Sequence, residues 1–311
     1  MDTLALILGL FFLIKGGAYL FEGSLAVSMK LNIPRFIIGM TVVSFATSAP
    51  ELVVSVQSAI MGYPDLALGN IVGSNIANVA FVLGIVVLLS PLKIEPVFYK
   101  FDWPIMMVVT LLFYFLIQSD SALTRIEGAV LVFAMIAYLF VILFFQKSRL
   151  VEDEVFEEEV TMKYTKIAYL ILFGGFLLWL GSEVLIKGAV GLASKLGESE
   201  RMISVSIIAF GTSIPELSTS IIAIMNKEHK ISIGNLIGSN IFDMLGIIGL
   251  TGLLSPIYIS DEALISNDLI WMIFVAFLIL PLVFFPNKMK LARAEGVILI
   301  LVYALFIGRL F

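Results

Sequence analysis

Two glutamates, Glu51 and Glu216, each follow a proline inside a strongly apolar stretch of this sequence. Residues 47–51 read T-S-A-P-E and residues 212–216 read T-S-I-P-E, so the two glutamates belong to two copies of one motif. An ionisable side chain at membrane depth costs at least about 2.5–3.5 kcal/mol to insert and is functional by default. Because ionised carboxylates bind cations, this duplicated motif predicts a cation site between two halves of the chain.

A second segment repeats with the same offset of 165 residues: residues 69–76 read G-N-I-V-G-S-N-I and residues 234–241 read G-N-L-I-G-S-N-I. Residues four apart share one face of a helix, so hydroxyl and amide or carboxylate oxygens meet on that face. Such oxygens suit sodium-sized ions, and we expect four residues to provide them: Ser74 with Asn78 in the first copy, and Ser239 with Asp243 in the second.

Pro50 and Pro215 should break their helices, because proline has no N–H and clashes with the carbonyl four residues earlier. In the first copy this releases the carbonyl of Ala46 and disturbs that of Thr47. Freed carbonyls at membrane depth are tolerated only where they face protein or a wet cavity. Two bidentate glutamates and two threonine carbonyls would supply six oxygens, which fits calcium. The hydroxyls of the serines before each proline add to this set or bond back to helix carbonyls; these serines are Ser48 and Ser213.

The plainer alternative is a pair of kinked helices in which each glutamate forms an ion pair with an intramembrane lysine. Lys15 and Lys187 are the candidates, but neither has a counterpart in the other copy, whereas the glutamate has one. Glu183 and Lys187 are four residues apart and can pair with each other. We interpret these residues, together with Glu22, as structural pairs or as residues near helix ends whose charges reach the interface.

Composition places the chain in a membrane: 60% of its 311 residues are hydrophobic and only 14% are charged. The net charge of −5 is not typical of nucleic-acid binding. The absence of cysteine excludes disulfides and thiolate metal sites, and oxygen ligands without His or Cys argue against zinc, copper or iron. No nucleophile–base pair is evident, so we expect neither an enzyme nor a bound cofactor. The N-terminal apolar run predicts a retained first span rather than a signal peptide.

We predict an all-α integral membrane protein with ten transmembrane helices. An odd number of helices in each copy makes the second copy enter the membrane inverted, which gives two inverted five-helix repeats. The first covers 1–146 and the second 167–311. The apolar runs, each about 20 residues long, are 3–28, 36–60, 66–89, 103–118, 123–146, 167–193, 202–225, 231–254, 268–285 and 292–310.

The orientation follows from the lysines and arginines between these spans. With both termini outside, thirteen of them lie inside and four outside, which agrees with the positive-inside rule. Residues 147–166 then form a cytoplasmic linker. Its acidic run at 152–159 favours a solvated segment over a cation site.

The two motifs together resemble the cation/calcium exchanger superfamily, most closely the prokaryotic type of its sodium/calcium exchanger branch. The resemblance covers essentially the whole chain, and its specific part is the two alpha-repeats, 36–90 and 201–255. It implies a multi-pass cell-membrane antiporter that exchanges calcium for sodium by alternating access, and we expect it to function as a monomer. The first and sixth helices would slide against a fixed core.

The resemblance also implies a ligand set for calcium and sodium. The side chains fall on Thr47, Ser48, Glu51, Ser74, Asn78, Thr212, Ser213, Glu216, Ser239 and Asp243, and the backbone carbonyls one turn before each threonine fall on Ser44 and Ala209.

The sequence departs from the family pattern at two positions, and the second of them keeps an alternative function open. Ala46 replaces a family glycine that Gly211 retains. Asp243 stands where potassium-dependent exchangers carry aspartate, but prokaryotic relatives share it. A potassium-dependent sodium/calcium exchanger is therefore one alternative. A proton/calcium exchanger on the same scaffold is a second, although Gly73 stands where that branch usually has the glutamate of G-N-x-x-E. A channel is disfavoured because an inverted repeat within one chain builds a closed site rather than a continuous pore.

Overall fold

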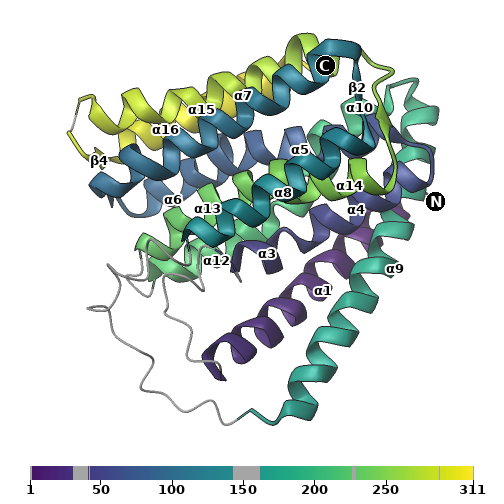
Figure 1. Ribbon diagram of the computed structural model, residues 1–311, viewed down its shortest axis with the longest axis horizontal. Coiled ribbons are helices and arrows are strands. Elements are labelled where there is room, and N and C mark those ends of the chain that lie inside the picture. The colour runs from purple at the N-terminus through teal and green to yellow at the C-terminus, as the bar shows by residue number, and fades with distance from the viewer. Residues whose placement is uncertain are drawn as a thin grey trace.

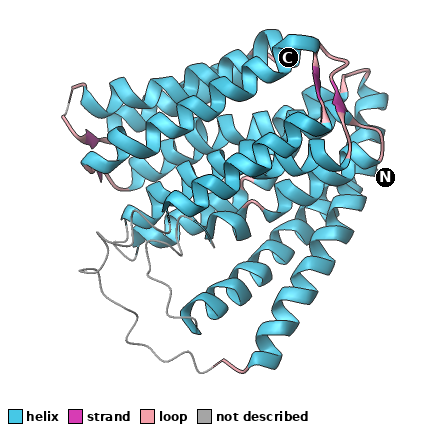
Figure 2. Ribbon diagram, viewed as in Figure 1, coloured by secondary structure: helices cyan, strands magenta, loops and turns pink. Residues whose placement is uncertain are grey.

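The structure is a computed structural model that describes residues 2–30, 41, 43–142, 162–225, 229–286 and 288–310. Nearly all of this chain is helical (Figure 2). Seven helical segments of the described chain are long and apolar enough to cross a membrane. They span Asp2–Ala26, Pro64–Leu89, Phe98–Ser119, Tyr164–Leu196, Glu200–Met225, Ser232–Leu254 and Leu264–Phe284.

Three shorter helical regions occupy the other predicted spans. They are α3 with α4 (Ser44–Thr47 and Ala49–Ile60), α8 (Arg125–Val141) and α16 (Arg293–Gly308). The protein is therefore an all-helical membrane protein, and the count of ten spans stays a prediction. Most of the predicted linker 147–166, with its acidic run, lies outside the described residues, as does the start of the predicted span 36–60.

Helices α1 (Asp2–Lys30) and α9 (Tyr164–Leu196) form a closely packed antiparallel pair. Figure 1 shows them side by side along one edge of the molecule. A Cβ placed on Gly16 would lie 2.8 Å from the carbonyl oxygen of Gly174, so only glycine permits this approach. The pattern repeats every seven residues, which keeps one seam of each helix against its neighbour; the glycines of this seam are Gly9, Gly16, Gly23, Gly174, Gly181 and Gly188.

Two long segments form the buried centre of the molecule. Each consists of an α-helix, a π-helical turn and a second α-helix, and most of each segment is inaccessible to solvent. The π turns begin beside the expected ligands Asn78 and Asp243, in keeping with the frequent occurrence of π turns at functional sites. The elements are α5 (Pro64–Ile76), η2 (Ala77–Val82) and α6 (Leu83–Leu89), then α13 (His229–Phe242), η6 (Asp243–Ile247) and α14 (Ile248–Leu254).

The segments that carry the glutamates are broken at equivalent places. In each copy a single serine separates two helices. Ser48 lies between α3, which ends at Thr47, and α4, which begins at Ala49. Ser213 lies between α11 (Ala209–Thr212) and α12 (Ile214–Met225). In both cases proline is the second residue of the new helix and glutamate the third. In the second copy α11 is preceded by α10 (Glu200–Ile203) and the π turn η5 (Ser204–Ile208).

The remaining helices cover the centre, and two short strand pairs tie their loops together. Strand β1 (Leu92–Lys93) pairs antiparallel with β4 (Lys290–Leu291), and β2 (Ala122–Leu123) pairs antiparallel with β3 (Ile257–Tyr258). Each pair joins a loop of the first half of the chain to a loop of the second, and the pairs lie at opposite ends of the bundle (Figure 2). The covering helices are η3 (Phe98–Asp102) with α7 (Trp103–Asp120), α8, η7 (Leu264–Asp268) with α15 (Leu269–Phe284), and α16.

Candidate functional site

The helix breaks place both glutamates in the first turn of a new helix. The backbone bonds that cross the first break run from Ser48 N–H to Ser44 O, 2.9 Å, and from Leu52 N–H to Ser48 O, 3.0 Å. No such bond reaches the carbonyls of Ala46 or Thr47 within the described chain. The second break has the same pattern of backbone bonds, 165 residues later. The positive end of each new helix favours an ionised glutamate at this position.

Three carboxylates are buried at the centre without enough hydrogen bonds to satisfy them. Glu51 is 1% exposed, and neither of its oxygens accepts a hydrogen bond from the described residues. Glu216 accepts one, from Ser48 Oγ at 3.3 Å, and Asp243 accepts one, from Asn75 Nδ2 at 3.1 Å. The charges of Glu216 and Asp243 act on Glu51, so the three groups share one electrostatic environment.

Neutral oxygens complete this environment. Ser74 Oγ and Thr212 Oγ1, from different halves of the chain, lie 3.2 Å apart. Several other buried oxygens make no hydrogen bond with the described chain. Those among the expected ligands, besides both oxygens of Glu51, are Asn78 Oδ1, Ser213 Oγ, Glu216 Oε2, Ser239 Oγ and Asp243 Oδ1.

Buried polar atoms without partners are rare in folded proteins, so a cluster of them indicates missing ligands. Carboxylate, amide and hydroxyl oxygens can all accept, and a cation satisfies them together. In the described chain no three His, Cys, Asp or Glu side chains come together to hold a metal. A cation bound among the carboxylates would also need neutral oxygens as ligands, a donor set that suits calcium or sodium better than zinc or copper.

Four asparagines that sequence reasoning did not assign to the site are part of it. Asn75 bonds Asp243, and Asn240 Oδ1 accepts from Asn78 Nδ2 at 3.2 Å, so each of these asparagines contacts an expected ligand of the opposite half. Asn70 and Asn235 likewise contact the threonines of the opposite half. Their exact repetition after 165 residues was the available signal, because asparagines in a helix need not repeat for packing alone.

The charges that we interpreted as structural pairs or helix-end residues lie apart from this cluster, on α1 and α9. Lys187 Nζ lies 2.7 Å from Glu183 Oε1, and Lys166 Nζ lies 3.6 Å from Glu22 Oε1. All four side chains are at least a third exposed. The pairing of Glu183 with Lys187 agrees with the structural role that we expected for it, and Lys15 is exposed as well.

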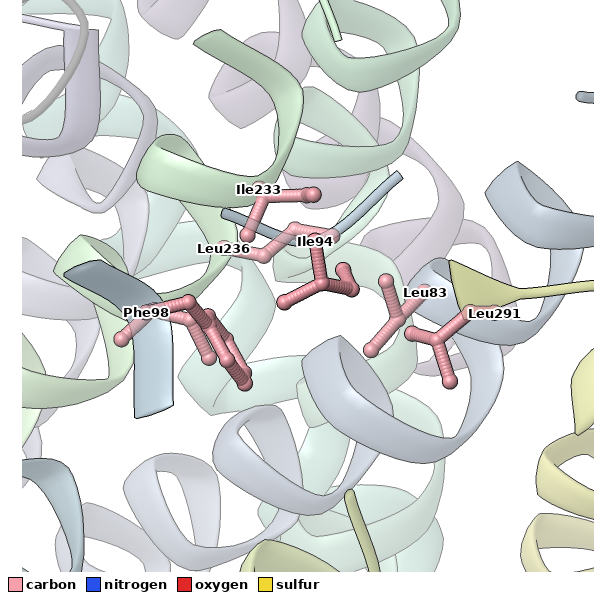
Figure 3. A pocket seen from close by; sticks show the side chains of 7 residues that line it. Leu83, Ile94, Phe98, Ile233, Leu236 and Leu291 are labelled. Carbon is pink, nitrogen blue, oxygen red and sulfur yellow. The ribbon is translucent and has the colours of Figure 1, made fainter. Parts of the chain in front are cut away.

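A small hollow elsewhere in the molecule is apolar and carries no such chemistry. It is lined by aliphatic and aromatic side chains from η3, α6, α13, strand β4 and the loop that follows β1 (Figure 3). The chemistry of the molecule is thus concentrated in the closely packed polar centre.

Comparison with known proteins agrees with this geometry. The family described as "Sodium/calcium exchanger protein" matches residues 1–144 and 166–311. The chain belongs to this family. It is 34% identical to a putative antiporter, CaxA, of Alkalimonas amylolytica, over 97% of this chain and 96% of that protein. It is also 30% identical to the sodium/calcium exchanger MaX1 of Methanosarcina acetivorans, over 100% of this chain and 99% of that protein.

The fold is likewise that of a solved exchanger. The structure matches that of the sodium-calcium exchanger NCX_Mj with a TM-score of 0.69 and 25% sequence identity, over 100% of this chain and 98% of that one. The family that the two motifs suggested is thereby confirmed. The protein is a multi-pass membrane cation/calcium exchanger and a transporter rather than an enzyme.

Proposed function

We propose that this protein exchanges calcium for sodium by alternating access at the central cluster of Glu51, Glu216 and Asp243. The observation that carries the proposal is the set of buried oxygens that find no hydrogen-bond donor among the described residues. Calcium and sodium both take oxygen ligands of this kind. Because they would use the same carboxylates, binding of one excludes the other, and this exclusion is what obligatory exchange requires.

The ligands we propose are those named from the sequence. They are the carboxylates of Glu51 and Glu216, the hydroxyls of Thr47, Thr212, Ser48, Ser213, Ser74 and Ser239, the side chains of Asn78 and Asp243, and the carbonyls of Ser44 and Ala209. Support comes from the contacts that already join them across the two halves, such as that between Ser48 and Glu216. The name of MaX1, a sodium/calcium exchanger that aligns along the entire chain, supports sodium as the coupling ion.

We propose an architecture of ten spans in two inverted halves, 1–146 and 167–311, with both termini outside and the monomer as the working unit. The matching helix breaks, π turns and strand pairs of the two halves support it. The chain has no cysteine, so single cysteines report orientation directly. A cysteine at exposed position Glu262 should react with an impermeant maleimide from outside, and one at exposed Lys288 only after the membrane is opened.

The deciding experiment is uptake of radioactive calcium into proteoliposomes loaded with sodium, with potassium, or with acidic buffer. Uptake that needs internal sodium and is indifferent to potassium supports sodium/calcium exchange. Uptake driven by internal acid alone identifies protons as the coupling ion, and a requirement for potassium together with sodium identifies potassium-dependent exchange. Voltage-driven calcium flux without any counter-ion contradicts the proposal, because it is the behaviour of a channel.

A further inference from the structure

The hydroxyl proton of Thr212 has three acceptors within reach. Asn70 Oδ1 and Ser74 Oγ each lie 3.2 Å from Thr212 Oγ1, and the carbonyl oxygen of Ala209 lies 3.4 Å from it. A threonine hydroxyl has one proton and two lone pairs. Where that proton goes therefore decides which of the surrounding oxygens keeps a lone pair for something else.

Two of these three acceptors would give up a lone pair that the cation could use if they took the proton. Ser74 Oγ and the Ala209 carbonyl both lie beside Thr212 in the proposed ligand set. The Ala209 carbonyl already accepts a backbone N–H at 3.1 Å, so one lone pair remains, and a proton from Thr212 would occupy it. Asn70 Oδ1 is the acceptor of the three that lies outside the ligand set.

The amide of Asn70 is oriented for this role. Its Nδ2 donates to Ser55 Oγ at 3.1 Å, which turns Oδ1 toward Thr212. Asn70 is fully buried, so no bulk water competes for its oxygen. Ser55 is on α4 and Asn70 on α5, both in the first half of the chain, while Thr212 ends α11 in the second half.

The threonine–asparagine contact recurs in the opposite sense, although the amide of Asn235 is oriented by Thr219 and not by Ser220, the counterpart of Ser55. Thr47 Oγ1 lies 3.4 Å from Asn235 Oδ1, and Asn235 Nδ2 donates to Thr219 Oγ1 at 3.1 Å. Each threonine thus meets an asparagine oxygen from the half to which it does not belong. A contact that is repeated after an exact 165-residue offset in both directions is a feature of the site and not a local accident of packing.

From these contacts we infer that Asn70 and Asn235 are positioning residues for ion binding. Each accepts the hydroxyl proton of the opposite half's threonine, Thr212 or Thr47. The threonine oxygen and the neighbouring oxygens then present lone pairs to the cation. The inference rests on the proposed function, because it assigns these asparagines a role in the same site. It also means that each half of the chain completes the ligands of the other.

A double-mutant cycle on the full-length protein tests this inference. The variants are Asn70→Ala, Thr212→Val and their combination, with Thr47→Val as the matched control because it removes the equivalent hydroxyl from the other side. The probe is radioactive calcium, bound at equilibrium to purified protein in sodium-free buffer. Thermal melting verifies that each variant is folded. If Asn70→Ala does not fold, Asn70→Leu, which fills a similar volume without an acceptor, replaces it.

Asn70→Ala should weaken calcium binding about fivefold, as expected for one lost neutral hydrogen bond. It should have less than about a twofold further effect in the Thr212→Val background, since the proton it accepts is gone. In the Thr47→Val background its full effect should persist. Asn235→Ala should show the reverse pattern, coupling to Thr47 and not to Thr212.

Asn70→Ala could weaken calcium binding equally in the wild-type, Thr212→Val and Thr47→Val backgrounds. That result would overturn the inference, because the effect of Asn70 would then not depend on the Thr212 hydroxyl. The proposed function is tested separately by adding sodium to the wild-type protein. If sodium fails to displace calcium while the cycle shows coupling, sodium exchange is wrong and the positioning role stands. If sodium displaces calcium and the cycle is additive, the positioning role alone is wrong.

Discussion

Replacing Glu51 by glutamine should abolish calcium transport and at the same time stabilise the protein in ion-free buffer. Glu51 is 1% exposed, and its two oxygens accept no hydrogen bond from the described residues. The negative charges of Glu216 and Asp243 act on it. The wild-type protein therefore buries a carboxyl group that a cation or a proton must neutralise, and the substitution removes this requirement with little change in shape.

The two effects have opposite signs and can be estimated. Removing one partner of a buried charge interaction typically costs about 3–5 kcal/mol. For calcium this corresponds to an affinity at least about 100-fold weaker. In ion-free buffer, the same substitution removes the repulsion of Glu51 by Glu216 and Asp243 and the cost of burying a carboxylate. We expect a gain of about 1 kcal/mol or more, and a melting temperature about 2 °C or more higher.

The assay compares purified wild-type and Glu51→Gln protein at pH 8, with chelator and then with calcium. The wild type should melt at a higher temperature when calcium is added, and the variant should not respond. Glu216→Gln is the companion variant. Its gain in ion-free buffer should be smaller, because Glu216 already accepts a hydrogen bond from Ser48, which a glutamine oxygen can keep. A Glu51→Gln protein that melts below the wild type in chelator, or that retains calcium uptake within tenfold, refutes this reasoning.

Gly73→Ala should lower stability by about 1–3 kcal/mol in thermal melts, because a Cβ there would lie 2.5 Å from a backbone oxygen; Gly175→Ala, with nothing within 4 Å, should be neutral or slightly stabilising. Arg201→Gln breaks two hydrogen bonds to buried Asp268, of 2.6 and 2.8 Å, and should cost about 3–5 kcal/mol. Adding Asp268→Asn should recover part of that loss, and a double variant that melts below the single one argues against an uncompensated charge. Asp243→Asn should reduce calcium uptake without abolishing it; complete loss would make this residue a primary calcium ligand.

The sequence predicted the two helix breaks well, because their signals were duplicated. A glutamate after a proline in an apolar run leaves few interpretations once it occurs twice, and both helix breaks fall where Pro50 and Pro215 place them. The asparagines of the second motif were visible in the same repeat. Their partners were not, because hydrogen bonds between residues 142 apart, such as that of Thr212 with Asn70, depend on how the two halves dock.

The sequence did not predict two other features of the structure, and the reasons are physical. The close packing of α1 on α9 depends on glycines seven residues apart in each helix, such as Gly16 and Gly174, and glycine also serves many other purposes in membrane helices. The ion pair of Arg201 with Asp268 joins two charges 67 residues apart, each of which alone resembles an ordinary helix-end charge. The seven long apolar helices end within about five residues of the corresponding predicted spans, because those apolar runs ended in charged or turn-forming residues.

Asn78 and Asp243 occupy equivalent positions in the two repeats but differ in charge, so a symmetric backbone carries an asymmetric set of side chains. Asn75 donates its amide to Asp243, whereas Asn240, its counterpart, accepts from Asn78 and donates to the carbonyl of Asn75 at 3.2 Å. The two asparagine amides thus face their equivalent partners with opposite ends.

An aspartate at position 78 would add a fourth buried carboxylate. Its oxygen would face the Oδ1 oxygen of Asn240, and because both atoms are acceptors, the Asn240 amide would have to turn over. The turned amide would lose its bond to the backbone of Asn75. The direction of one buried amide therefore favours three carboxylates in the cluster rather than four, and in the proposed function it also sets the charge that the transported cations would balance.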